Sequence, residues 1–242
     1  MITSIKVAIL EDHQSIIDGY IYRLGMVPDI QIVGTGLFGD DLEPLLAQHQ
    51  VNVLLLDLSL PISAENNNIF PIRHELPNVF AQYPSLKVIV ISVFEQPALV
   101  RAMIKLGAHG YIVKEDQNSI KNLARIVKVV AGGGIFLSSD LKAYISLADQ
   151  DELLTPRQIE ALSLCVAYPD MTASILAQKM NISSSTFRNI LSGAYQRLEV
   201  RTRNAAVRRV EEMGIILRKT SSTQHKRKKT GLDHIWRQLD DI

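Results

Sequence analysis

Short apolar runs rich in β-branched residues alternate with longer amphipathic stretches through the first half of the chain. The runs predict strands at residues 6–10, 31–34, 53–56, 86–91 and 110–113. The stretches between them predict helices, for instance at 14–24, 40–48, 97–106 and 117–131. Such alternation is typical of βαβ units, which pack helices on both faces of a parallel sheet. The first half therefore predicts a doubly wound α/β domain with five parallel strands, over residues 1–131.

Three consecutive glycines, Gly132, Gly133 and Gly134, follow the last of these helices. Because glycine ends helices and loosens the chain, we predict a linker over residues 132–151, with some helical content near 141–147.

The second half of the chain has helical patterns. Thr155 and Gln158 predict a capping box at the start of one helix, and Ser183 predicts the N-cap of another. The helix after Ser183 repeats apolar residues at spacings of three and four: Phe187, Leu191, Ala194 and Leu198. A last helix is expected over 204–217. Two of these helices, joined by a tight turn, predict a helix-turn-helix within an all-α unit of four helices, at residues 152–217.

Polar residues follow four of the five predicted strands. Glu11 and Asp12 follow the first and Asp57 the third, while Ser92 closes the fourth and Lys114 the fifth. Each of them alone could be an ordinary strand-end cap or a surface charge. In an open parallel sheet, however, ligands bind beyond the carboxyl ends of the strands, where these residues would gather. Together they predict a functional site centred on Asp57.

A cluster of Glu11, Asp12 and Asp57 is costly without a cation, because neighbouring carboxylates oppose each other's ionisation. Mg²⁺ would relieve the repulsion, since it binds through one or two carboxylates and favours sites that also hold phosphate. Asp57 is then the candidate nucleophile, because a carboxylate can form an acyl phosphate. Lys114 would neutralise one phosphoryl oxygen, and the Ser92 hydroxyl would donate a hydrogen bond to another.

From residue 5 to about residue 130 the chain resembles the receiver domain of bacterial two-component response regulators, which has a flavodoxin-like fold. The resemblance is carried by Glu11-Asp12-His13, Asp57 with Pro61, Ser92, and the segment Gly107-Ala108-His109-Gly110-Tyr111-Ile112-Val113-Lys114. It implies that Asp57 accepts a phosphoryl group from a sensor histidine kinase. It also implies the ligands of Mg²⁺: Glu11, Asp12, Asp57 and the carbonyl of Ser59.

The resemblance further implies a switch, in which Ser92 moves toward the new phosphate and Tyr111 follows by changing rotamer. Tyr111 could instead be an aromatic residue of ordinary sheet packing. One departure from the family pattern is residues 62–68, which lengthen the segment after Asp57. This segment could alter the access of a kinase or phosphatase, or it could be a tolerated surface insertion.

Residues 154–214 resemble the LuxR/NarL-type DNA-binding domain. The matching stretches are Leu154-Thr155-Pro156-Arg157, Ile182-Ser183 with Thr186-Phe187-Arg188, and Leu198-Glu199-Val200-Arg201-Thr202-Arg203. Both domains occur in the order of the NarL/FixJ class of response regulators, which the chain resembles over nearly its whole length. Two residues depart from the family pattern, Ile190 and Gly193. They bear on which DNA sequence is recognised rather than on whether DNA is bound.

Basic residues gather in the second half of the chain. Residues 1–150 contain 11 Lys or Arg and 15 Asp or Glu, whereas residues 151–242 contain 15 and 10. This asymmetry favours a polyanion-binding module, although scattered surface charge could also produce it. The residues expected to contact double-stranded DNA are Ser185, Arg188, Asn189, Ser192, Gln196, Arg197, Arg201 and Arg203. Arg188 and Asn189 could read base edges, while the later arginines would anchor phosphates.

The remaining features of the sequence concern the cellular compartment and the C-terminal tail. Cys165 is the only cysteine, which excludes an internal disulfide and favours a reducing cytoplasm. The resemblance implies that this cytoplasm is bacterial. The sequence has no apolar stretch of membrane-spanning length and no signal peptide, so no membrane partner is expected. Residues 218–242 form a tail that the resemblance does not cover. Its basic run, 226–229, could reach DNA phosphates or be a plain linker, and an amphipathic helix is expected after it.

We therefore expect a phosphorylation-controlled transcription factor that binds two-fold DNA sites as a homodimer. It is not expected to be an enzyme beyond Mg²⁺-dependent self-phosphorylation and autodephosphorylation at Asp57. In the unphosphorylated form, the receiver or linker would cover the recognition helix or disfavour the dimer. One alternative is a DNA-binding regulator whose receiver serves dimerisation without phosphorylation. Another is a phosphatase with an aspartyl-phosphate intermediate, which Ser59 disfavours because a second carboxylate usually stands at that position.

Overall fold

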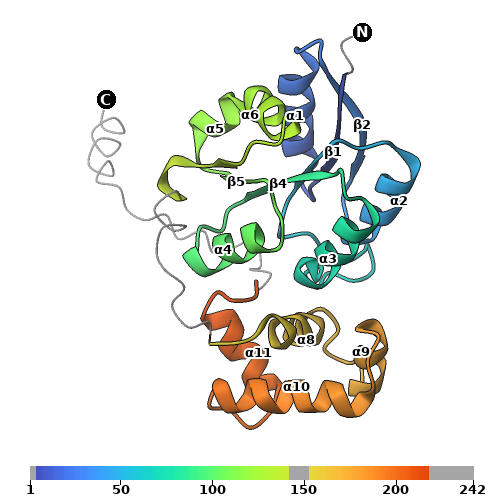
Figure 1. Ribbon diagram of the computed structural model, residues 1–242, viewed down its shortest axis with the longest axis vertical. Coiled ribbons are helices and arrows are strands. Elements are labelled where there is room, and N and C mark those ends of the chain that lie inside the picture. The colour runs from blue at the N-terminus through green and yellow to red at the C-terminus, as the bar shows by residue number, and fades with distance from the viewer. Residues whose placement is uncertain (1–3, 142–152, 218–242) are drawn as a thin grey trace, which may run out of the picture.

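Six parallel strands form one sheet in the N-terminal domain of the structure, a computed structural model that describes residues 4–141 and 153–217 (Figure 1). The strands are β1 Ile5–Leu10, β2 Ile30–Gly36, β3 Val53–Leu56, β4 Lys87–Ser92, β5 Gly110–Val113 and β6 Phe136–Leu137. Their order across the sheet is β2-β1-β3-β4-β5-β6. The prediction of five strands is wrong by one. β6 has two residues, too few to produce a strand pattern, and it pairs with β5 from within the predicted linker.

Helices cover both faces of this sheet, as the alternating pattern predicts. One face carries α1 Gln14–Gly25, α5 Gln117–Lys121 and α6 Leu123–Ala131; the other carries α2 Leu42–Gln48, α3 Ile72–Gln82 and α4 Pro97–Lys105. A 3-10 turn, η1 Gly39–Asp41, leads into α2. Side chains alternate along the strands, so Ile9 of β1 packs in the core toward α1 whereas Leu10 packs in the core toward α2. Two cores therefore hold the strand ends in place.

The helix predicted at 117–131 is divided in the structure. The Asn122 side chain donates a hydrogen bond to the carbonyl of Asn118 at 2.8 Å, and so competes with the backbone for that acceptor. The chain consequently forms α5 and α6 with Asn122 between them.

The described part of the C-terminal domain contains the helices α8 Pro156–Ala167, α9 Ala173–Lys179, α10 Ser184–Arg197 and α11 Arg203–Glu212. The predicted capping box is confirmed: the Thr155 hydroxyl accepts from the Gln158 amide at 3.3 Å, and the Gln158 side chain accepts from the Thr155 amide at 2.9 Å. Ser183 caps α10 as predicted. Between α9 and α10, Asn181 turns the chain with a φ of 54°, a left-handed conformation that asparagine tolerates better than most residues.

α11 ends five residues earlier than the prediction of 217. Gly214 has a φ of 65°, the left-handed conformation with which glycine commonly ends a helix. The chain then turns back toward the α/β domain, where Leu217 joins the core that contains Leu58 and Leu99. The C-terminal domain is thereby tied to the first domain at α3 and α4 (Figure 1).

No helix within the described ranges is long and apolar enough to span a bilayer. The helical content expected near 141–147 falls outside the described residues, apart from the end of a 3-10 turn, η2 Ser139–Leu141. The basic run at 226–229 and the amphipathic helix expected after it also lie outside them.

Candidate functional site: a carboxylate cluster and an exposed helix

Four strands deliver the predicted residues to one edge of the sheet. β1 leads directly into Glu11, which is 1% exposed, and β3 leads into Asp57, which is 2% exposed. The Asp57 amide donates to the Leu10 carbonyl at 2.9 Å, so the parallel pairing of β1 and β3 continues to this carboxylate. Lys114 follows β5 and donates its amide to the Ser92 carbonyl at 2.8 Å, which brings the ends of β4 and β5 together.

Lys114 joins the two buried carboxylates. Its Nζ lies 2.7 Å from Oε2 of Glu11 and 3.2 Å from Oδ2 of Asp57. Burial alone would lower the pKa of Lys114, but the charges of Asp57 and Glu11 outweigh it and raise that pKa. Lys114 therefore remains a cation at neutral pH and holds one positive charge between the two acidic groups.

Asp57 is incompletely paired. The contact from Lys114 is close enough to count as an ion pair, yet it lacks the angle of a hydrogen bond. Neither carboxylate oxygen of Asp57 has a hydrogen-bond partner of ordinary geometry among the described residues. Burial raises the pKa of Asp57, although Lys114 opposes this. A buried carboxylate with free lone pairs is costly, and a group that binds it would recover that cost.

Glu11 shares this environment. Burial raises the pKa of Glu11, and the nearby charge of Asp57 raises it further. Asp12 is half-buried, and its Oδ1 lies 2.7 Å from Nδ1 of His13, which is also 3.3 Å from Oε1 of Glu11. Ligand atoms of these three consecutive residues lie within 4.8 Å of one another. Oxygen ligands from mutually repelling carboxylates suit a hard divalent cation such as Mg²⁺.

His13 belongs to this cluster, although no role was predicted for it beyond its place in the motif. Its position directly after the acidic pair was the available signal. Ser59 is half-buried on the segment that follows Asp57.

Ser92 and Tyr111 are connected through the backbone after β4. The Ser92 hydroxyl accepts from the Phe94 amide at 3.2 Å, and the Tyr111 hydroxyl donates to the Phe94 carbonyl at 2.6 Å. Both side chains are fully buried. A movement of Ser92 toward a group on Asp57 would release the Phe94 amide, so the segment that holds Tyr111 would have to adjust.

Residues 62–68, which lengthen the segment after Asp57, form a loop that is closed by hydrogen bonds at its base. Gly39 and Asp40 donate their amides to the carbonyls of Pro61 and Ile62 at 2.8 and 2.9 Å. Pro61 also pairs with Ile69 in an antiparallel bridge. The loop is therefore partly integrated into the domain, which differs from a purely superficial insertion.

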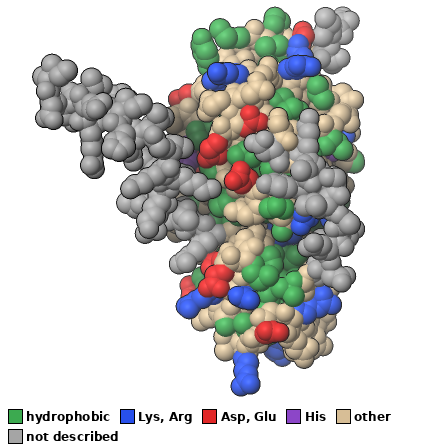
Figure 2. Space-filling view, turned by 90° about the vertical axis from the view of Figure 1, so that its left-hand side faces the viewer, with side chains coloured by type: hydrophobic (Ala, Val, Ile, Leu, Met, Phe, Trp, Pro, Cys, Tyr) green, Lys and Arg blue, Asp and Glu red, His purple; other side chains and the backbone are tan. Residues whose placement is uncertain are grey.

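The outward face of α10 carries the predicted base-reading residues. The exposed side chains are Ser185, Arg188, Asn189, Ser192, Gln196 and Arg197, and Arg201 is exposed in the turn that follows. Figure 2 shows Lys and Arg side chains projecting from the lower end of the molecule, which the helical domain forms. A basic, exposed helix of this kind can enter a DNA groove.

Arg203 does not belong to this face. It is half-buried, and its guanidinium donates to the carbonyls of Met171 at 2.7 Å and Tyr168 at 2.9 Å. The prediction of a phosphate contact for Arg203 is therefore at odds with the structure, because the fork of the side chain is occupied by the turn after α8. Arg197 makes a weaker contact of 3.3 Å with the carbonyl of Leu153 and remains exposed.

The structure explains why Gly193 and Ile190 depart from the family pattern. A Cβ at Gly193 would lie 2.9 Å from Nε2 of Gln158, so the glycine lets α10 approach the capping box of α8. Ile190 is half-buried and packs against the helical core.

The first domain does not cover the outward face of α10 in the described ranges. α3 contacts α8, whereas α10 lies on the far side of the helical domain (Figure 1). The expectation that the first domain covers this helix is wrong for residues 4–141. The expectation of a disfavoured dimer stays a prediction.

The chain is similar to several curated regulators. It is 32% identical over 176 residues to the transcriptional regulatory protein UhpA of Salmonella typhimurium, covering 71% of this chain and 82% of the relative. It is 27% identical over 226 residues to the transcriptional regulatory protein DegU of Brevibacillus brevis, covering 84% and 91%. The transcriptional regulatory protein DesR of Bacillus subtilis is 29% identical over 210 residues, covering 87% and 98%. No family model matches the chain.

Solved structures share the fold. RcsB of Salmonella enterica serovar Typhimurium, bound to promoter rprA in the presence of phosphomimetic BeF3-, superimposes with a TM-score of 0.61 at 20% identity, covering 86% of this chain and 98% of that one. A complex of the two-component response regulator RcsB with DNA gives a TM-score of 0.54 at 22% identity, covering 88% and 100%. At this identity the likeness concerns the fold, with both domains in the same order.

Proposed function

Because the chain belongs to the NarL/FixJ class of response regulators, we propose that it is a transcription factor whose binding to double-stranded DNA is controlled by phosphorylation of Asp57. The observation that carries the proposal is the buried carboxylate of Asp57, which forms an ion pair with Lys114 but has no hydrogen-bond partner of ordinary geometry among the described residues. A structural carboxylate in that position would have its lone pairs satisfied, since buried polar groups are nearly always hydrogen-bonded.

The chemistry assigned to Asp57 is nucleophilic. One of its oxygens bonds to the phosphorus of a phosphohistidine on a sensor kinase, or of a small phosphodonor, while the bond from phosphorus to the leaving group breaks. Lys114 lies where it can neutralise a phosphoryl oxygen, and its pairing with Glu11 keeps it from swinging away. Ser92 supplies a hydroxyl at the end of the neighbouring strand.

The same proposal includes Mg²⁺, held by Glu11, Asp12, Asp57 and the carbonyl of Ser59. When bound, the ion would neutralise charge on the transferring phosphoryl oxygens. The residues that would hold it fit this role, because burial raises the pKa of both Glu11 and Asp57, and the charge of Asp57 raises that of Glu11 further.

The readout is assigned to Ser92 and Tyr111. Phosphorylation adds acceptor oxygens that attract the Ser92 hydroxyl, which at present accepts from the Phe94 amide. Tyr111 would then follow, because its hydroxyl depends on the Phe94 carbonyl.

DNA recognition is assigned to α10, acting in a homodimer on two-fold sites. Arg188 can pair with guanine and Asn189 with adenine in the major groove, while Arg197 and Arg201 can contact phosphates. RcsB has been solved as two dimers bound to two parallel DNAs, so a fold of this kind supports dimeric binding.

A gel-shift titration tests the proposal. The full chain is compared with and without acetyl phosphate and Mg²⁺, together with Asp57→Asn and the matched control Asp18→Asn, an exposed acid on α1. We expect the phosphodonor to increase promoter affinity in the wild type and in Asp18→Asn, but not in Asp57→Asn. Acetyl phosphate that fails to label the wild type, with promoter binding unaffected by Asp57→Asn, would overturn phosphorylation control.

That outcome would favour the alternative, in which the receiver serves dimerisation without phosphorylation. Its support is the exposure of α10 while the two domains are in contact, since such a molecule could bind DNA without a prior signal. Under this alternative, deletion of residues 4–131 would abolish dimers, whereas Asp57→Asn would leave them intact.

A further inference from the structure

Residues 62–68 form a loop to which the proposed function gives no role. An antiparallel ladder closes the base of this loop. The Phe70 amide donates to the Leu60 carbonyl at 2.9 Å, and the Ile62 amide donates to the Asn68 carbonyl at 3.0 Å. The two sides of the loop are therefore held together, and Asn68 has a fixed place at its end.

The base of the loop is anchored in the core of the first domain. Ile62, Ile69 and Phe70 are all buried there, in the same core as Leu58. The Phe70 ring packs directly on Gly39, where a Cβ would overlap the ring, so the glycine lets the loop close against η1. The loop is thus a rigid extension of the sheet edge that carries the carboxylate cluster.

Asn68 reaches from this loop to the helical domain. Its Nδ2 donates to the carbonyl of Ala167 at 3.0 Å. Ala167 is the last residue of α8, and the last carbonyls of a helix have no partner within that helix. The Asn68 amide donates to Oδ1 of Asn66 at 3.1 Å, which holds the donor in place. Asn68 therefore caps the C-terminus of a helix that belongs to the other domain.

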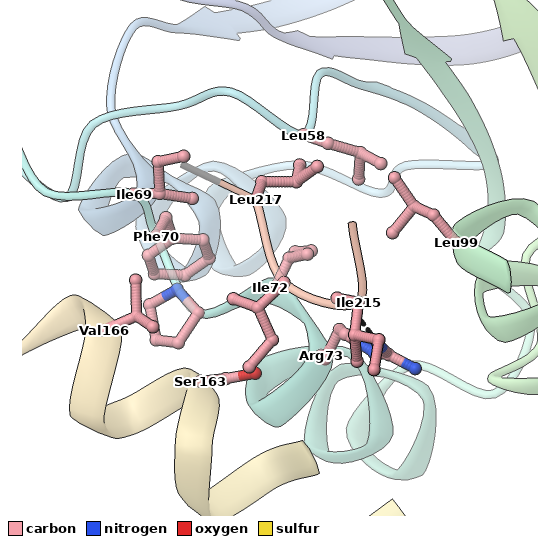
Figure 3. Close-up of a pocket in the computed structure, with 12 residues that line it drawn as sticks. Leu58, Ile69, Phe70, Ile72, Arg73, Leu99, Ser163, Val166, Ile215 and Leu217 are labelled. Carbon is pink, nitrogen blue, oxygen red and sulfur yellow. Dashed lines mark hydrogen bonds between the residues drawn. The ribbon is translucent and has the colours of Figure 1, made fainter. Parts of the chain in front are cut away.

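Apolar side chains surround this bond. Phe70 and Ile72 face Val166 of α8 across a cavity of about 30 Å³ (Figure 3). A volume of that size holds a water molecule or two and no larger ligand. Ala167 is fully buried and lies in the core of the first domain. Without Asn68, its carbonyl would lose a donor in a place that water does not reach.

Two side-chain contacts from α3 support the same helical domain. Arg73 donates to the carbonyl of Ile215 at 2.7 Å, and Nδ1 of His74 lies 2.9 Å from Oε1 of Glu160 on α8. The first domain thus contacts α8 near its middle, through α3, and at its end, through the loop. Two separated contacts define the direction of a helix, whereas one would leave it free to pivot.

The direction of α8 determines that of the exposed helix. α10 packs against α8, and Gly193 allows the close approach of the two helices. A bond at the end of α8 therefore acts on the direction in which α10 points from the first domain.

We propose that residues 62–68 are a docking arm, through which the first domain binds the end of α8 and sets the direction of α10. Docking by this arm goes beyond phosphorylation control and does not depend on it; only its consequence for DNA binding rests on the proposed function. The arm differs from both roles that the sequence left open for this loop. A gate for a kinase or phosphatase, or a tolerated insertion, would leave the contact between the domains unaffected.

Energy transfer between two dyes measures docking in the full chain. The dyes are placed on cysteines introduced at Gln48 on α2 and Gln178 on α9, which are both exposed, while the buried Cys165 stays unlabelled. Transfer is followed as urea is added, and far-ultraviolet circular dichroism identifies the range in which both domains remain folded. The docking constant is then obtained within that range.

Asn68→Asp is the test variant, because it keeps the shape of the side chain but cannot donate. It also places a negative charge against the carbonyl end of α8, which the helix dipole makes unfavourable. Since the buried Ala167 carbonyl loses its donor, we expect the docking constant to fall by about fivefold or more. Asn68→Ala removes the donor without adding a charge and should lower the constant about fivefold, which keeps the test decisive if Asn68→Asp unfolds.

Asn67→Asp is the matched control, since Asn67 is exposed in the same loop and the change adds the same charge one residue away. It should dock like the wild type. Docking that is unchanged in both Asn68 variants, or an equal loss in Asn67→Asp, overturns the docking arm.

Labelling of Asp57 by acetyl phosphate and Mg²⁺ is measured on the same proteins. Altered labelling of the Asn68 variants with intact docking would overturn the arm in favour of a gate. A wild type that acetyl phosphate does not label would contradict the proposed function, whereas the docking measurement needs no phosphodonor and would still decide the arm. The two failures are therefore distinguishable.

Discussion

Arg203 has a different role in the structure from the one that the sequence pattern predicts. In the sequence it is one of six arginines between Ser183 and Val210, of which those after Arg188 are expected to contact phosphates. In the structure its guanidinium donates to the carbonyls of Tyr168 and Met171, which belong to the turn between α8 and α9. We therefore predict that Arg203→Gln destabilises the helical domain instead of weakening one phosphate contact.

The magnitude follows from the two hydrogen bonds. A hydrogen bond to a charged group contributes about 1.5 to 3 kcal/mol, and removing the donor leaves its acceptor unpaired. The two bonds share one guanidinium, so their contributions do not simply add. We expect Arg203→Gln to lower the free energy of unfolding by about 3 kcal/mol.

Urea unfolding and the salt dependence of DNA binding measure the two effects separately. Arg201→Gln is the matched control, because Arg201 is exposed two residues away. We expect Arg201→Gln to leave unfolding unchanged and to reduce the slope of log affinity against log salt by about 0.9. Unchanged unfolding in Arg203→Gln together with a reduced salt slope would refute the structural role.

Three further predictions concern the interior. Burial raises the pKa of Asp57, so the folded state binds this proton more tightly than the unfolded state does. Stability is therefore lost as the pH rises above the pKa of the unfolded state and through that of the folded state. Asp57→Asn should raise the melting temperature at pH 7 but not at pH 3. Tyr111→Phe leaves the Phe94 carbonyl without its buried donor and should cost about 1 kcal/mol in urea unfolding. Gly193→Ala should not yield the gain of about 1 kcal/mol expected in a helix, because its Cβ would press on Gln158; the gain should appear in a Gln158→Ala background.

Much of the first domain was predictable because its signals are local. Four apolar runs with polar residues at their ends predicted that Glu11, Asp57, Ser92 and Lys114 would lie at one edge of the sheet, and they do. The pattern works since parallel strands present their carboxyl ends together. The caps of α8 and α10 were predictable for the same reason, because a cap involves residues only three positions apart.

The remainder depends on contacts between distant residues. Arg203 reaches carbonyls 32 and 35 residues earlier, and His74 reaches Glu160 across 86 residues. No periodicity records such a meeting, so an arginine that binds carbonyls and one that binds phosphates look alike in the sequence. β6 was not predicted for another reason, since a strand of two residues shows no periodicity in the sequence.

The exposure of α10 limits how phosphorylation could control DNA binding. A domain that docks on α8 leaves the recognition face free, so releasing it would not uncover that face. Docking does, however, fix the direction in which α10 points relative to the receiver domain. Two helices in a dimer must match half-sites about 34 Å apart, so a wrong direction prevents binding as effectively as a cover. Leu58, the neighbour of Asp57, lines the contact between the domains and packs in one core with Leu217. A change at Asp57 therefore has a short packed route to the orientation of the helical domain, which makes geometry, rather than access, the quantity that the proposed switch would alter.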